Sequence, residues 1–135
     1  MLPFQIVIAA HGSLAAAFRA SAEMICGPQA SIVALGLEPT ESPEGFADRM
    51  REAIGPQGAR TLLLTDLPGG TPNNVARLVA RDRPNTVIVA GINLGIVIEA
   101  VTNLNALDEA AVERLVSTGR DSIVESTRRL VRDIS

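Results

Sequence analysis

Four short apolar runs alternate with helical segments along the chain, and this alternation constrains the fold more than any other feature. The runs are rich in Val, Ile and Leu and span residues 4–10, 31–37, 61–66 and 86–91. Continuous apolar runs of this length are typical of strands that are covered on both faces. Strands that alternate with helices through short connections form right-handed βαβ units, which predict a mostly parallel sheet.

The expected architecture is therefore an α/β fold with three layers, in which helices cover both faces of a four-stranded sheet. For a domain this short, the commonest arrangement places the first and third strands side by side, which gives the strand order 2-1-3-4. The chain has 135 residues and contains no linker or repeat, so we expect residues 1–135 to form one domain.

Capping residues mark where the helices begin and end. Ser42-Pro43 and Thr71-Pro72 each combine a cap with a proline at the first helical position, so Thr71 is expected to cap a helix that begins at Pro72. Asp108 is expected to cap another helix, which Gly119 should end. The predicted helices span residues 14–26, 44–54, 73–82, 94–104 and 109–118.

Composition excludes several classes of function. A net charge of -3 argues against a nucleic-acid surface, and the basic residues are all arginines. Without lysine, the chain cannot form a Walker-type phosphate loop, a Schiff base or a pyridoxal phosphate linkage. One histidine and one cysteine cannot supply the usual ligands of a zinc site, so we expect neither a metal nor a cofactor. No signal peptide or membrane-spanning run is evident, and a cytoplasmic protein is expected.

The candidate functional residues follow the predicted strands at one edge of the sheet. His11, the only histidine, follows the first strand in "HGS", and Asp66 follows the third in "DLPGGTP". "GINLG" follows the fourth strand. In an open parallel sheet, sites form beyond the carboxyl ends of the strands where the strand order reverses. The lone histidine, the aspartate and two glycine-rich helix entrances should therefore meet in one crevice.

Phosphoryl transfer through histidine fits these residues better than the alternatives. Ser13 lies too close to His11 in sequence for a serine hydrolase, the chain has no G-x-S-x-G elbow, and the first turn lacks the G-x-G-x-x-G of dinucleotide-binding folds. An imidazole can attack phosphorus with one nitrogen when a carboxylate such as that of Asp66 orients the other. Backbone N–H groups and helix N-termini would then hold the phosphoryl oxygens. The expected phosphoryl-binding residues are Gly12, Ser13, Gly69, Gly70 and Thr71, and the possible walls of the site are Leu67, Pro68, Asn93 and Leu94.

These motifs, in this order and spacing, resemble the enzyme IIA component, mannose class, of the bacterial phosphoenolpyruvate-dependent sugar phosphotransferase system. The likeness rests on the "IVI..HG" opening, the central "D..GG[ST]P.N" and the "GINL" after the fourth strand, and it spans residues 4 to about 130. The resemblance implies that His11 accepts a phosphoryl group from the phosphocarrier HPr and passes it to a IIB component. It also implies that Asp66 pairs with the imidazole and that Thr71 helps to hold the phosphoryl oxygens.

Two departures from the family pattern leave alternatives open. Many family members carry an aromatic residue in the central loop, where this chain has Leu67 and Pro68. Many are also fused to a IIB domain through a linker, which is not seen here. A stand-alone regulatory module, whose phosphorylation state controls a protein partner, is therefore the alternative to a carrier in sugar uptake. A plain ligand-binding domain of flavodoxin type, with His11 never modified, is a third interpretation.

The C-terminal tail, residues 120–135, is ambiguous. "SIVEST" alternates like a short strand, whereas Ile123, Leu130 and Ile134 fit a helix on the chain's own subunit. The edges of a four-stranded sheet invite pairing with another chain, and exchange of a segment is an easy route to a dimer. The resembling family exchanges an antiparallel fifth strand in this way. We therefore expect a homodimer in which the tail crosses to the partner.

Overall fold

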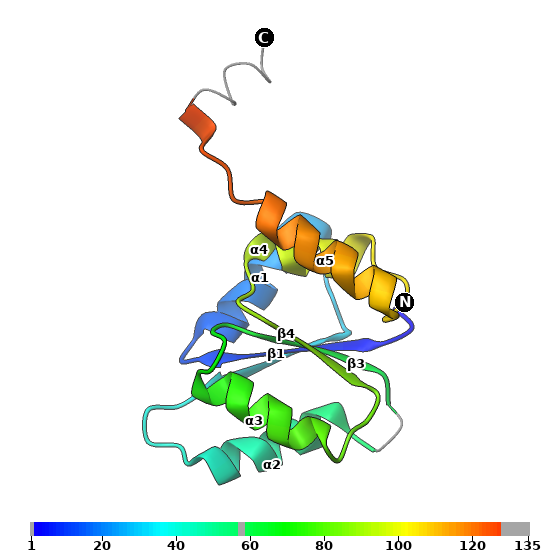
Figure 1. Cartoon of the computed structure of the whole chain (residues 1–135). Coiled ribbons are helices and arrows are strands. Elements are labelled where there is room, and N and C mark those ends of the chain that lie inside the picture. The colour runs from blue at the N-terminus through cyan, green and yellow to red at the C-terminus, as the bar shows by residue number, and fades with distance from the viewer. Residues whose placement is uncertain (1, 57–58, 128–135) are drawn as a thin grey trace.

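A computed structural model describes residues 2–56 and 59–127. The elements follow one another as β1 Gln5–His11, α1 Leu14–Cys26, β2 Ile32–Leu37, α2 Pro43–Ile54, β3 Thr61–Thr65, α3 Thr71–Ala80, β4 Thr86–Ala90, α4 Leu94–Thr102 and α5 Glu109–Asp121. They form three layers, with α2 and α3 on one face of the sheet and α1, α4 and α5 on the other (Figure 1). None of the described helices is long and apolar enough to cross a membrane.

The sheet has the predicted strands and the predicted order. Its strands are parallel and lie in the order β2-β1-β3-β4. From β1 the chain continues to β2 through α1 on one face, and from β3 it continues to β4 through α3 on the other (Figure 1). The strand order therefore reverses between β1 and β3, and the carboxyl ends of these two neighbouring strands open a site between α1 and α3.

Alternating side chains of the central strands build two hydrophobic cores. One alternate set on β1 packs toward α1, α4 and α5, and the other packs toward α2 and α3. The first core includes Ile6, Ile8, Leu62, Leu64, Val97 and Leu115, and the second includes Val7, Leu63, Phe46, Met50, Ala76 and Val79. This two-sided burial is the reason that the strands read as continuous apolar runs.

Two of the predicted helix caps are confirmed. The Ser42 hydroxyl accepts a hydrogen bond from the Gly45 N–H at 3.0 Å, and an Asp108 carboxylate oxygen accepts one from the Ala111 N–H at 2.8 Å. The third prediction is wrong, because α3 begins at Thr71 itself and Gly70 is the N-cap. Gly70 is extended, with φ -73° and ψ 166°, and this N-cap makes no side-chain hydrogen bond. The Thr71 hydroxyl is thus not used as a cap.

Gly119 does not end α5, contrary to the sequence prediction. The helix continues to Asp121, and Gly119 is buried within it. A methyl group on Gly119 would collide with the Ile96 side chain on α4. The glycine therefore lets α5 pack closely on α4, which explains its presence inside a helix.

Gly36 shapes the turn that follows β1. A methyl group on Gly36 would overlap the carbonyl oxygen of Gly12, and the Gly12 N–H donates to the Leu37 carbonyl at 2.9 Å. Gly12 itself has φ 58°, a left-handed conformation that glycine adopts without strain. The chain can therefore leave β1 tightly against the end of β2, directly after His11.

The strand expected in "SIVEST" is not formed in the part of the chain that the structure describes. Residues 123–125 have no regular structure, and Ser126 and Thr127 are helical. The antiparallel fifth strand is thus absent from residues 120–127, and the rest of the expected tail lies outside the described residues. A strand exchanged between two copies would pair only with a second chain, so the exchange stays a prediction.

Candidate functional site at the ends of β1 and β3

His11 and Asp66 meet across the ends of the two central strands. The Nδ1 atom of His11 lies 2.8 Å from Oδ2 of Asp66, and the same oxygen accepts the His11 backbone N–H at 3.0 Å. The other carboxylate oxygen accepts the Leu67 N–H at 3.0 Å. Both oxygens of Asp66 are therefore engaged, and the carboxylate has a fixed orientation toward the imidazole.

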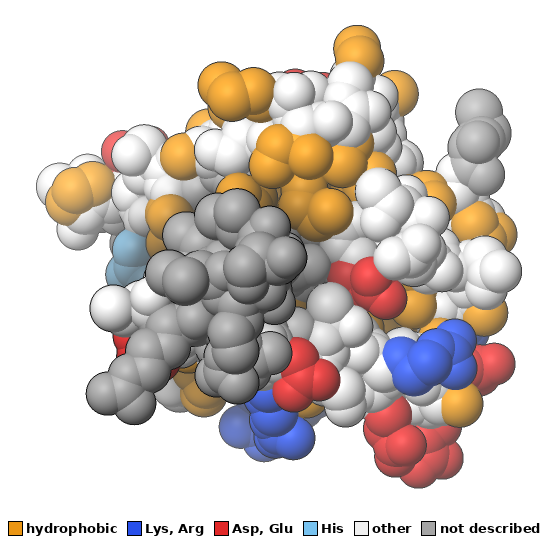
Figure 2. Space-filling model, turned by 90° about the horizontal axis from the view of Figure 1, so that it is seen from above, with side chains coloured by type: hydrophobic (Ala, Val, Ile, Leu, Met, Phe, Trp, Pro, Cys, Tyr) orange, Lys and Arg blue, Asp and Glu red, His pale blue; other side chains and the backbone are white. Residues whose placement is uncertain are grey.

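This contact determines which ring nitrogen is available. An ionised carboxylate only accepts hydrogen bonds, so Nδ1 carries the proton in the neutral imidazole and Nε2 keeps its lone pair. The His11 side chain is 47% exposed, whereas that of Asp66 is only 8% exposed. Figure 2 shows the histidine in pale blue at the rim of the molecule. The buried carboxylate thus presents an accessible nucleophilic nitrogen.

The surroundings of Asp66 favour its ionised form. Burial acts to raise the pKa of Asp66, but the hydrogen bonds from the His11 backbone N–H and imidazole, together with the imidazole charge, outweigh it. The net result is a pKa below the ordinary value. An ionised Asp66 is the form that can hold the proton on Nδ1 and stabilise positive charge on the ring.

The loop after Asp66 is a tight turn that packs against the imidazole. The Gly70 N–H donates to the Leu67 carbonyl at 3.1 Å, Pro68 occupies the second position and Gly69 has φ 80°, which are the features of a type II turn. A methyl group on Gly70 would lie only 3.1 Å from His11 Cε1. Gly70 therefore lies against the edge of the ring, and a larger residue there would require the ring or the loop to shift by a few tenths of an ångström.

Two helices begin at the same edge of the sheet without acidic residues in their first turns. The N-cap of α1 is Ser13, which makes no side-chain cap bond, and α3 begins after Gly70. The first turn of a helix leaves backbone N–H groups without intrahelical partners, and its dipole favours negative charge. The predicted phosphoryl-binding residues Gly12, Ser13, Gly69, Gly70 and Thr71 all belong to these two helix entrances. The N–H groups of Gly12, Gly69 and Gly70 already donate to the Leu37 carbonyl, the Asn73 side chain and the Leu67 carbonyl. The arrangement suits an anion held beside Nε2 of His11.

The predicted wall residues differ in their surroundings. Leu67 is 57% exposed, and Pro68 lies next to Gly91 at the end of β4. Asn93 caps α4 by accepting the Ile96 N–H at 3.0 Å, and its amide donates to the Gly119 carbonyl and the Ser122 hydroxyl. Asn93 therefore joins α4 to α5. That Leu67, Pro68, Asn93 and Leu94 form walls of the site stays a prediction.

Sequence reasoning assigned no role to two asparagines in the first turn of α3. Asn73 is buried, and its oxygen accepts the Gly69 N–H at 3.0 Å. Asn74 is exposed, and its amide donates to the Gly69 carbonyl at 3.1 Å. The signal in the sequence was the asparagine pair three residues after a Gly-Gly turn, because side chains there can reach back to the loop backbone.

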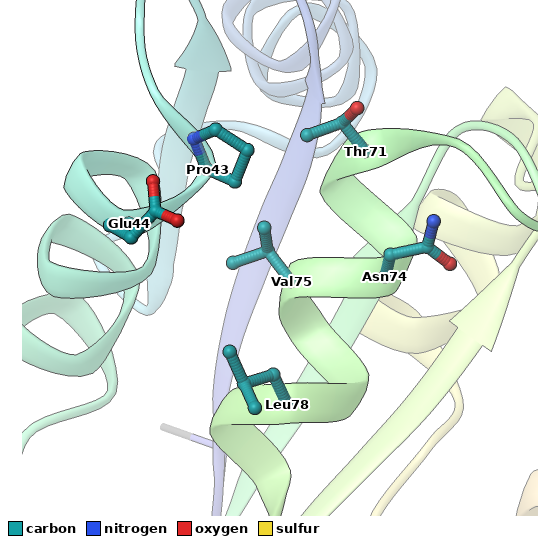
Figure 3. Close-up of a pocket in the computed structure, with 6 residues that line it drawn as sticks. All are labelled: Pro43, Glu44, Thr71, Asn74, Val75 and Leu78. Atoms are coloured by element: carbon teal, nitrogen blue, oxygen red, sulfur yellow. The ribbon is translucent and has the colours of Figure 1, made fainter.

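A groove of about 240 Å³ lies beside the site, between the start of α2 and α3. Figure 3 shows its lining residues, with the Thr71 hydroxyl turned away from Val75 and Leu78. The lining comprises Pro43, Glu44, Thr71, Asn74, Val75 and Leu78, so His11 lies outside it. In the described residues, no group of three or more His, Cys, Asp or Glu side chains could hold a metal ion.

The lowered pKa of Asp66 predicts a pH-dependent contribution to stability. As the pH falls, the unfolded chain takes up the proton first, near the ordinary value of 3.8. The stabilisation is therefore complete above that value and is lost as the pH falls through the lower folded-state pKa. Urea unfolding of the wild type and Asp66→Asn should show a free-energy difference near neutral pH that shrinks in strong acid. A difference that stays constant into strong acid would contradict this assignment.

Comparisons with known proteins show the family to which the chain belongs. A family model described as "EIIA-man: PTS system fructose IIA component" matches residues 5–117. The sorbose-specific EIIA component of Lacticaseibacillus casei is 32% identical over 114 residues, covering 84% of this chain and 80% of the relative.

Solved structures of similar proteins share the fold. The mannose/sorbose-specific IIA subunit from Enterococcus faecalis has a TM-score of 0.80 and 30% identity, covering 92% of this chain and 94% of that one. The IIA protein associated with the fucose utilization operon of Streptococcus pneumoniae has a TM-score of 0.81 and 27% identity, covering 96% and 99%. The chain therefore belongs to the mannose-class EIIA family of the sugar phosphotransferase system.

Proposed function

We propose that the chain is a phosphoryl carrier that accepts phosphate from phospho-HPr on His11 and passes it to a IIB component. Membership of the EIIA family implies a phosphocarrier role in general. The observation that carries the specific proposal is the 2.8 Å contact between His11 Nδ1 and Asp66, which leaves Nε2 free and exposed. Relatives are named for different sugars, and the proposal concerns the phosphoryl group rather than the sugar.

In the proposed reaction, the Nε2 lone pair attacks the phosphorus of phospho-HPr. A bond forms between Nε2 and phosphorus, the bond from phosphorus to the donor breaks, and its electron pair leaves with HPr. The proton on Nδ1 stays in the hydrogen bond to Asp66, whose charge offsets the positive charge on the ring. Attack by the IIB acceptor on the same phosphorus then regenerates neutral His11.

The helix entrances would hold the phosphoryl oxygens during both steps. The N–H groups of Gly12, Gly69 and Gly70 already donate within the chain. Ser13 would therefore contribute from the start of α1, and Thr71 from the start of α3. Because Thr71 is not the cap of α3, its hydroxyl is available for this purpose. The half-exposed imidazole also suits a phosphoryl donor that is itself a protein, because the donor's surface must reach Nε2.

Phosphorylation by the upstream proteins tests the proposal. The chain is incubated with phosphoenolpyruvate, enzyme I and HPr, and its intact mass is measured. We expect the gain of one phosphoryl group that is acid-labile and alkali-stable, as a phosphohistidine is, and no gain in His11→Ala. Equal uptake by His11→Ala, or no uptake by the wild type, would refute the proposal.

Two further variants in the same assay separate the proposed roles. Asp66→Asn should be phosphorylated slowly, because loss of the orienting carboxylate in a serine protease costs about 10⁴-fold in rate. Thr71→Ser, which keeps the hydroxyl, is the matched control for Thr71→Ala. If Thr71→Ala is phosphorylated as fast as Thr71→Ser, the hydroxyl has no part in transfer.

We also propose that the protein is a homodimer held together by its tail. Residues 122–127 follow the end of α5 and run away from the sheet (Figure 1). They include Ile123 and Val124, which are 78% and 49% exposed. Exposed apolar side chains on a projecting segment are suited to packing against a second copy.

Truncation after Ser122 tests the dimer, because Ser122 still bonds Asn93 and α5 stays complete. Sedimentation at micromolar concentration should give a dimer for the full chain and a monomer for the truncated chain. A monomeric full-length protein, or a dimer that survives removal of residues 123–135, would show that the tail does not hold two copies together.

A further inference from the structure

A buried hydrogen-bond chain connects the core of the sheet to the loop that packs on the imidazole. Thr65, the last residue of β3, is fully buried. Its hydroxyl oxygen accepts a hydrogen bond from the Asn73 amide at 3.2 Å, and the Asn73 oxygen accepts the Gly69 N–H at 3.0 Å. Asn73 is itself only 7% exposed. The amide NH₂ group of Asn73 therefore bonds the sheet, and its amide oxygen bonds the loop.

The position of Gly69 determines the position of Gly70, which lies against the imidazole. Gly69 and Gly70 are the last two residues of the type II turn, and a methyl group on Gly70 would come within 3.1 Å of His11 Cε1. Cε1 lies between the two ring nitrogens. A small movement of the turn would thus move the ring edge and change how Nδ1 meets Asp66.

We infer that Asn73 is a positioning residue for His11, which acts by fixing the Gly69-Gly70 backbone against the imidazole. Within the described residues, the Asn73 side chain makes hydrogen bonds to Gly69 and Thr65 and none to the imidazole or Asp66, so its effect passes through the loop. The expected effect of Asn73 on phosphoryl transfer rests on the proposed phosphoryl-carrier function. A purely structural Asn73 would stabilise the start of α3 without changing the state of the imidazole.

Thr65 supplies the fixed end of this chain. The hydroxyl belongs to a residue of a central strand, because Thr65 pairs with both β1 and β4. A side chain anchored only to the loop would move with it, whereas one anchored to the sheet holds the loop in place. Within the described residues, the side chain of the exposed Asn74 bonds the Gly69 carbonyl and makes no hydrogen bond to the sheet. Asn73 therefore fixes the position of the Gly69-Gly70 loop, and with it the ring, relative to the sheet.

The test compares Asn73→Ala with Asp108→Ala by two readouts. Asn73→Ala removes two side-chain hydrogen bonds beside the start of α3. Asp108 caps α5 at the opposite edge of the sheet, so its replacement removes one hydrogen bond at a helix start and leaves the His11 loop intact (Figure 1). The first readout is the rate of transfer from saturating phospho-HPr. The second is the ¹⁵N NMR spectrum of the imidazole, which is unambiguous because the chain has a single histidine.

We expect Asn73→Ala to slow transfer by on the order of 10- to 100-fold, as small misplacements of a reacting group do. In the unphosphorylated protein, its imidazole should lose the preference for the tautomer that carries the proton on Nδ1. Asp108→Ala should match the wild type in both readouts. A folded Asn73→Ala with wild-type rate and spectrum, or an equal change in Asp108→Ala, would overturn the inference.

Two further arms keep the result decisive. If Asn73→Ala does not fold, Thr65→Val removes the anchoring hydroxyl at nearly the same volume, and the same outcomes apply to it. If the wild type takes up no phosphate, the proposed function fails, but the imidazole spectrum still decides whether Asn73 positions the ring. The two failures are therefore distinguishable.

Discussion

The hydrogen bond between His11 and Asp66 is the interaction on which the candidate site depends. It joins the ends of two neighbouring parallel strands, and it requires the β1-β3 pairing that places Ala9 beside Thr65. The neighbouring loop and helix starts surround this contact. The turn after Asp66 confines the ring, the start of α3 supports the turn, and the two helix entrances leave N–H groups for an anion.

Close backbone approaches make the contact possible. Gly36 lets the carbonyl of Gly12 pass over β2, so the chain turns away directly after His11. Gly70 allows the loop from β3 to lie against the imidazole edge. A larger residue at Gly36 would meet the backbone of Gly12, and one at Gly70 would displace the ring or the loop slightly. The geometry of the site thus depends on two glycines, Gly36 and Gly70, as well as on His11 and Asp66.

The sequence predicted the sheet well because burial on both faces leaves a strong pattern. Each strand is a continuous apolar run, and the topology rules allow few arrangements of four parallel strands. His11 and Asp66 could be predicted together because both follow strands that meet at the reversal of strand order. Ser42 and Asp108 were recognised as caps by their local chemistry alone.

The errors arose where tertiary packing overrides local preference. Threonine is a common N-cap residue, which favoured Thr71. The N-cap of α3 is instead Gly70, because the loop must lie close to the ring. Glycine often ends a helix, which favoured Gly119 as the end of α5. Gly119 instead lies inside α5, where it allows close packing against Ile96. The role of Asn73 depends on a hydrogen bond to Thr65, eight positions away in the sequence, and no periodic pattern encodes such a bond.

The most direct test of the proposed mechanism is to identify which nitrogen of His11 carries the phosphoryl group. The protein is labelled with ¹⁵N in its single histidine, phosphorylated through HPr, and examined by NMR for coupling between phosphorus and each ring nitrogen. Because Asp66 holds Nδ1, we expect phosphorus on Nε2, with Nδ1 still protonated. Phosphorus on Nδ1 would contradict the mechanism, because the Asp66 hydrogen bond would then have to break for the transfer to occur.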